Sequence, residues 1–134
     1  MPITPRRRHL SSYRPAYKAG FNVCEVHTGP YAHAYLACGG DFVSPRLAAE
    51  LTQVKKAGEI IVASGMRFNA GHALNYHNVS EIARLSGVCE LHIGHSIVSR
   101  AIHSGMAQAV TNMVRTIQDA VSLQNTLSPK KANQ

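Results

Sequence analysis

Histidine and glycine stand together in three segments of this 134-residue chain, residues 25–29, 69–72 and 90–95. An imidazole titrates near neutral pH, which suits it to act as a general acid or base. Glycine allows backbone N–H groups to approach a bound anion closely. Two of the segments begin with a glutamate, which adds a carboxylate. Three such segments in register would form a site for acid–base chemistry on an anionic molecule.

Each segment is expected to lie at the end of a short strand. Runs of β-forming residues predict strands over residues 21–27, 66–69 and 88–93. Apolar residues at helical spacing predict helices over residues 45–64, 78–85 and from Ser96 through Val121. A glycine-bearing loop is expected to fill the stretch between Thr28 and Asp41.

The predicted order β-α-β-α-β-α indicates an α/β fold. Strands separated by helical crossovers pair in parallel and need helices on their outer face. In such sheets ligands gather where strands end and loops lead into helices. All three histidine-bearing segments are therefore expected at the same edge of the sheet.

Three longer motifs carry a resemblance to a known family. They are Glu25-Val-His-Thr-Gly-Pro-Tyr-Ala32, Asn69-Ala-Gly-His-Ala-Leu-Asn-Tyr-His-Asn78 and Glu90-Leu-His-Ile-Gly-His95. With the helices around them, they make the chain from about Gly20 to Ala120 resemble the carboxyl-terminal half of the pyridoxine 5′-phosphate synthase family. The resemblance implies the last three units of a (β/α)8 TIM barrel, parallel strands with outer helices, over residues 20–124.

The same resemblance implies an activity. The family condenses 1-deoxy-D-xylulose 5-phosphate with 3-amino-2-oxopropyl phosphate and closes the ring to pyridoxine 5′-phosphate, with release of phosphate and water. It uses no cofactor and no metal, works in the cytoplasm and is oligomeric. Phosphorylated small molecules are therefore the expected substrates of this vitamin B6 biosynthesis enzyme.

Five positions match the family's functional residues. His72 matches the proton donor, and Glu25 matches a carboxylate that stabilises charged intermediates. Gly94 and His95 match residues that hold the aminoketone phosphate, and Ala73 matches a contact to the same substrate. Without the motif, a packed structural histidine would be the favoured interpretation of His72, and a buried ion pair is the alternative for Glu25. Structural roles are expected for His27, His77 and His92.

The formal net charge of +7 lies at the two ends of the chain. Residues 1–18 contain five basic and no acidic side chains, whereas residues 19–129 contain seven of each. We expect a basic, poorly ordered tail over residues 1–19, for which a transit peptide is the alternative, and a polar, basic tail over residues 125–134. The folded part is neutral, which argues against a nucleic-acid partner. No apolar run approaches the ~20 residues of a membrane span.

Nothing in the chain matches the first half of the family, which supplies the other catalytic residues. Because three strands cannot close a barrel, the sequence predicts a truncated family member. Such a chain would be stabilised by self-association, as a homo-oligomer, or by pairing with a separate amino-terminal half. A non-catalytic phosphate-binding or assembly fragment, and a tail-driven nucleic-acid binder, are the alternative functions.

Overall fold

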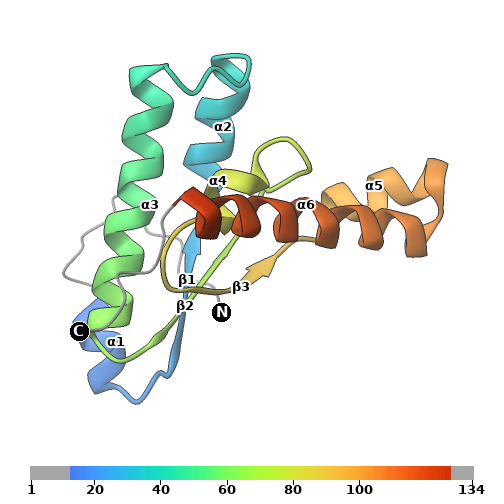
Figure 1. The fold of residues 1–134 in the computed structure, drawn as a ribbon. Coiled ribbons are helices and arrows are strands. Elements are labelled where there is room, and N and C mark those ends of the chain that lie inside the picture. The colour runs from blue at the N-terminus through green and yellow to red at the C-terminus, as the bar shows by residue number, and fades with distance from the viewer. Residues whose placement is uncertain (1–12, 128–134) are drawn as a thin grey trace.

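The computed structural model describes residues 13–127 and confirms the α/β fold, with a parallel sheet of three strands in the order β1-β2-β3. The strands are β1 (Val23–His27), β2 (Arg67–Gly71) and β3 (Val88–His92). The helices are α1 (Tyr13–Lys18), α2 (Gly29–Ala37), α3 (Pro45–Ala63), α4 (Val79–Ala83), α5 (His95–Ser104) and α6 (Met106–Leu127). A sheet of this kind is a partial TIM barrel (Figure 1).

One face of the sheet is packed against helices. Val26, Phe68 and Ala70 point to this face, where they are buried with Val54 and Ile61 of α3. Gly58 of α3 lies directly over the Phe68 ring, because a Cβ atom at Gly58 would come within 2.2 Å of Phe68 Cε1. The alternation of a strand therefore sends the adjacent residues of β1 and β2 to the opposite face.

The opposite face is polar. Glu25, Asn69 and Glu90 lie side by side on β1, β2 and β3, since Glu25 pairs with Asn69 and Asn69 pairs with Glu90 in the strand register. The side chains of Glu25 and Glu90 are about half exposed, whereas Asn69 is buried. This charged face is the one that a closed barrel would enclose.

Helix α2 occupies a stretch for which the sequence predicts a loop. Glycine and proline are read as loop signals there, but Pro30 lies in the first turn of α2, where its missing N–H costs nothing. Tyr31 is fully buried, and its hydroxyl donates a hydrogen bond of 2.8 Å to the carbonyl of Asn78. This contact holds α2 against the residue that precedes α4.

The amino-terminal tail prediction also differs from the structure over residues 13–18, which form α1. Ala16 packs against the core, and its carbonyl accepts a hydrogen bond of 3.2 Å from the backbone N–H of Phe21. At the other end, α6 extends into the predicted carboxyl-terminal tail as far as Leu127. The rest of the two predicted tails, residues 1–12 and 128–134, lies outside the described residues.

The helical pattern after Ser96 is divided into two helices. Gly105, at φ 78°, separates α5 from α6, and the two helices pack against each other as a hairpin (Figure 1). Helix α6 also packs against α4, where Ala109, Met113 and Ala120 are buried. Within the described residues, no helix is both long and apolar enough to cross a membrane.

Candidate active site

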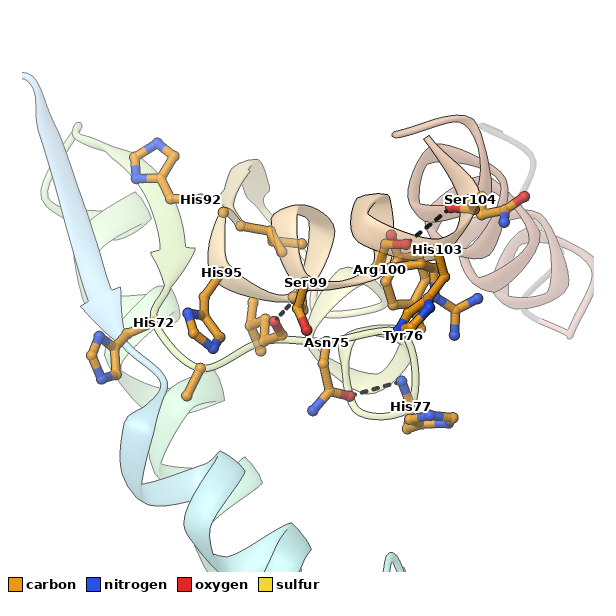
Figure 2. A pocket seen from close by; sticks show the side chains of 16 residues that line it. His72, Asn75, Tyr76, His77, His92, His95, Ser99, Arg100, His103 and Ser104 are labelled. Carbon is orange, nitrogen blue, oxygen red and sulfur yellow. Dashed lines mark hydrogen bonds between the residues drawn. The ribbon is translucent and has the colours of Figure 1, made fainter. Parts of the chain in front are cut away.

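The backbone just after β2 adopts a conformation that side chains rarely tolerate. His72 has φ 83° and Ala73 has φ 58°, and these are the two non-glycine residues with positive φ among residues 13–127. Each such residue costs about 1–3 kcal/mol, and such residues cluster at functional sites. Figure 2 shows the His72 imidazole beside the end of β1, on the side away from α5.

Hydrogen bonds from three other segments hold this turn in place. The Thr28 hydroxyl, fully buried, lies 2.6 Å from the carbonyl oxygens of both Gly71 and His72. The Asn78 amide donates to the carbonyl of Ala73 at 3.2 Å, and the Ser96 hydroxyl donates to that of Leu74 at 2.9 Å. Side chains that follow β1, β2 and β3 thus contact four consecutive carbonyls, and the carbonyl of Gly71 also accepts the backbone N–H of Thr28 at 2.7 Å. The strained turn is preorganised by this arrangement.

His27 and His72 form a stacked pair of imidazoles. Their ring centroids lie 4.1 Å apart, with 27° between the ring planes. Gly29 makes room for the pair, because a Cβ atom at this position would lie 2.5 Å from His27 Cε1 and 3.1 Å from His72 Cδ2. The glycine that the first motif contains is therefore required by the two rings.

A chain of polar contacts crosses the exposed face of the sheet beside the turn. His92 Nδ1 lies 2.6 Å from Glu25 Oε2, and the Asn69 amide donates to Glu90 Oε2 at 3.0 Å. Arg67 forms an ion pair with Glu90. The hydrogen bond that the Glu25 carboxylate accepts from His92 raises the pKa of His92 above its ordinary value. The hydrogen bond from Arg67 lowers the pKa of Glu90.

The carboxylate of Glu25 lies close to Gly71, the residue immediately before the turn. A Cβ atom at Gly71 would lie 2.5 Å from Glu25 Oε1, so the carboxylate lies against the backbone immediately before His72. Asn69 Oδ1, on the same strand, is a buried side-chain oxygen without a hydrogen-bond partner among the described residues. The carboxylate that the sequence predicts for the site therefore lies beside the residue that precedes His72, across β1 and β2.

A pocket of about 1130 Å³ opens between the turn after β2 and helix α5. His72, Ala73, Gly94 and His95 all line it, as Figure 2 shows for the two histidines. Gly94 immediately precedes α5, so the first backbone N–H groups of this ten-residue helix lie at the pocket. Groups of three or more histidine, cysteine, aspartate or glutamate side chains that could hold a metal ion are absent from the described residues.

The structure brings together residues that the sequence left in structural roles. His92 contacts Glu25 although 67 positions separate them, and His27 stacks on His72. Strand alternation combined with a parallel register would have indicated the first contact, because Glu25 and His92 then lie on the same face two strands apart. Stacking depends on side-chain rotamers and left no signal in the sequence.

Comparisons with known proteins decide the family. The model of the pyridoxal phosphate biosynthesis protein PdxJ family matches residues 5–119. The chain belongs to the PdxJ family.

Curated relatives agree with the PdxJ assignment. Three proteins named pyridoxine 5′-phosphate synthase illustrate the similarity: those of Azoarcus sp. strain BH72 (57% identical over 107 residues), Aromatoleum aromaticum (53% over 114) and Dechloromonas aromatica (53% over 105). The matches cover 80%, 85% and 78% of this chain but 43%, 45% and 42% of the relatives. The chain therefore spans less than half the length of these PdxJ proteins.

Proposed function

We propose that the chain forms the carboxyl-terminal part of a pyridoxine 5′-phosphate synthase active site. The reaction is the condensation of 1-deoxy-D-xylulose 5-phosphate with 3-amino-2-oxopropyl phosphate, followed by ring closure to pyridoxine 5′-phosphate, phosphate and water. The observation that carries the proposal is the strained turn at His72 and Ala73, held by four hydrogen-bonded carbonyls and open to the pocket. The relatives are named pyridoxine 5′-phosphate synthase, and the substrates and products proposed here are those that the family resemblance of the sequence implies.

In this proposal His72 donates a proton during ring closure. Its imidazole is exposed at the pocket, and the stack on His27 fixes the plane of the ring. A histidine in a fixed orientation can deliver its proton along one direction, which is what general acid catalysis requires. Glu25 stabilises positive charge that develops on the intermediates, while His92 holds its carboxylate at 2.6 Å.

Gly94, His95 and Ala73 bind the phosphate of the aminoketone. Gly94 has no side chain and nothing would lie within 4 Å of a Cβ atom there, so a phosphate can approach the backbone N–H groups at the start of α5. Ala73, which lines the pocket and has a positive φ, serves through its backbone. No organic cofactor is proposed.

The three-stranded sheet is completed, we propose, by further strands of the same family, in a second copy or in a separate amino-terminal half. Glu25, Glu90 and His92 are each about half exposed, although they form the face that a barrel would enclose. A cytoplasmic location is proposed as well, because Cys24, Cys38 and Cys89 are all free thiols.

Substitution of His72 tests the proposed reaction. The chain is mixed with the amino-terminal half of the Azoarcus relative and both substrates, and pyridoxine 5′-phosphate is measured by mass spectrometry. We expect His72→Gln to lower turnover by about 10²–10⁴-fold, the usual contribution of a general acid. His33→Gln, an exposed histidine on α2, is the matched control and should retain turnover.

Two outcomes of this assay would contradict the proposal. Unchanged turnover in His72→Gln would remove the proton-donor role. Calorimetric binding of a phosphate ester without product from any mixture would instead support a non-catalytic phosphate-binding or assembly fragment, a function favoured by the half-exposed polar sheet face.

A further inference from the structure

One wall of the pocket is a polar stripe along α5. Pocket-lining residues of this helix recur at positions i, i+1, i+4 and i+5, which places them on one side of the helix. The stripe runs from the first to the last of the ten residues of α5, roughly 13–14 Å along the helix axis. Its members are His95, Ser96, Ser99, Arg100, His103 and Ser104. This length exceeds what a single bound phosphate would occupy at Gly94 and His95.

The whole pocket is lined by basic and neutral side chains. One arginine and five histidines face it, and no aspartate or glutamate is among its lining residues. Two of these histidines, His77 and His103, lie toward the end that holds Arg100, away from His72 (Figure 2). A concave surface with positive charge and no negative charge attracts anions.

Arg100 is held in position by an aromatic platform. Its guanidinium carbon lies 4.0 Å from the centroid of the Tyr76 ring, and the Tyr76 hydroxyl donates a hydrogen bond of 2.8 Å to the carbonyl of Ala109 on α6. Within residues 13–127, no acidic side chain forms an ion pair with Arg100. The guanidinium edge therefore remains open to an oxyanion, which arginine binds through paired N–H groups.

We propose that Arg100, His103 and His77 form a second anion subsite, which binds a phosphate-type oxyanion at the end of the pocket distant from His72. Arg100 lies five positions after His95, or roughly 7–8 Å along the helix axis. The ligand is either free phosphate or the far phosphate group of a molecule that carries one at each end. The proposal relies on the proposed function only for the first anion at Gly94 and His95.

The test uses the full 134-residue chain and inorganic phosphate alone. Histidine side-chain resonances are followed by NMR during the titration, and calorimetry gives the affinity. In the wild-type chain the His103 signals shift on phosphate addition. Arg100→Gln should weaken the phosphate affinity reported by His103 about tenfold or more, because a charge-assisted hydrogen bond is lost. The His95 response should persist.

The matched control is Arg115→Gln, an exposed arginine on α6 that does not line the pocket. It should reproduce the wild-type titration. Tyr76→Leu, which removes the platform and leaves Arg100 in place, should weaken the His103 response in the same direction as Arg100→Gln. Circular dichroism checks that each variant is folded, and only folded variants are compared.

Three results would overturn the subsite: no His103 shift in the wild-type chain, an unchanged titration in Arg100→Gln, or equal loss of the His95 and His103 responses. The source of the anion is separated with 1,4-butanediol bisphosphate. If the wild-type chain binds the bisphosphate more tightly than phosphate, and Arg100→Gln abolishes this difference, the subsite belongs to a two-phosphate ligand. If the two affinities are equal, the subsite belongs to free phosphate. No arm requires turnover, so failure of the proposed reaction leaves this test intact.

Discussion

At the scale of single residues, the site depends on hydrogen bonds that hold a strained backbone. Thr28 fixes the turn at His72 from a neighbouring strand, and its hydroxyl is fully buried. His92 fixes the carboxylate of Glu25 in the same way from β3. Both contacts join residues more than 40 positions apart in sequence, and both can be removed by substitutions of nearly equal volume.

Thr28→Val should destabilise the fold. The change keeps the shape of the side chain but leaves the carbonyls of Gly71 and His72 without the hydroxyl, which costs about 1–3 kcal/mol for a buried group. The free energy of unfolding is measured by urea denaturation. Thr52→Val, which removes an exposed hydrogen bond to the carbonyl of Ala48 within α3, is the control and should change the free energy of unfolding by less than about 0.5 kcal/mol. Equal effects of the two substitutions would contradict the role of Thr28.

The contact between His92 and Glu25 should make stability depend on pH. The carboxylate raises the pKa of His92 above 6.5, so the folded state holds this proton more tightly than the unfolded chain. Its stabilising contribution is therefore fully present below about pH 6.5 and is lost as the pH rises through the higher pKa of the folded state.

Urea denaturation from pH 5 to pH 9 checks this dependence in the wild-type chain and in Glu25→Gln. The free energy of unfolding of the wild-type chain should exceed that of the variant most at the acidic end of this range. The difference should shrink as His92 loses its proton. NMR titration of His92 should also show a lower pKa in the variant. A stability difference that is constant across this range would refute the ion pair.

At the scale of elements, α3 packs against the face of β2 that is opposite the polar network. Gly58 allows α3 to approach β2 closely, because the Phe68 ring occupies the place of a side chain at this position. The next residue of β2, Asn69, then faces the polar network on the other side of the sheet. The distance between α3 and β2 therefore affects where β2 places Asn69 in the polar network.

Gly58→Ala should destabilise the protein even though alanine favours a helix. Helix propensity gains about 1 kcal/mol, but the new Cβ atom would lie 2.2 Å from Phe68 Cε1, and overpacking costs about 1–3 kcal/mol. Thermal unfolding of the single variant and of Gly58→Ala with Phe68→Leu measures the conflict. The second change should recover part of the loss in the Gly58→Ala background. A more stable single variant would show that α3 can move away from the sheet.

At the scale of the whole molecule, the described sheet has two open edges at which a partner could bind. Within residues 13–127 neither the outer side of β1 nor that of β3 pairs with another strand. Open strand edges are templates for pairing with another chain. Large apolar side chains are also exposed on α5 and α6, among them Val98, Ile102 and Leu123.

We therefore expect the chain to associate in a concentration-dependent manner, which light scattering and sedimentation velocity would detect. Val23→Lys places a charge on the β1 edge and should reduce the association. Val43→Lys, at a position that is 87% exposed outside the strands, is the control and should leave it unchanged. A folded, soluble monomer of 14.5 kDa at high concentration would contradict this expectation.

Local patterns in the sequence determined much of this protein. Alternation and helical spacing predicted the three strands, α3 and α4, and the motifs around His72 and Gly94 predicted the family. These features depend on neighbouring residues, which interact through the backbone period of a strand or helix. They could therefore be read without any knowledge of distant contacts.

The tertiary structure decided what depends on contacts between distant segments. Helix α2 is held in place by the hydrogen bond from the buried Tyr31 hydroxyl to the carbonyl of Asn78. Helix α1 is held by Ala16, which packs against the core. The partnership of Glu25 with His92 depends on the register of three strands. These contacts form only when the fold brings distant segments together, so they follow from the arrangement of the strands and helices and not from neighbouring residues alone.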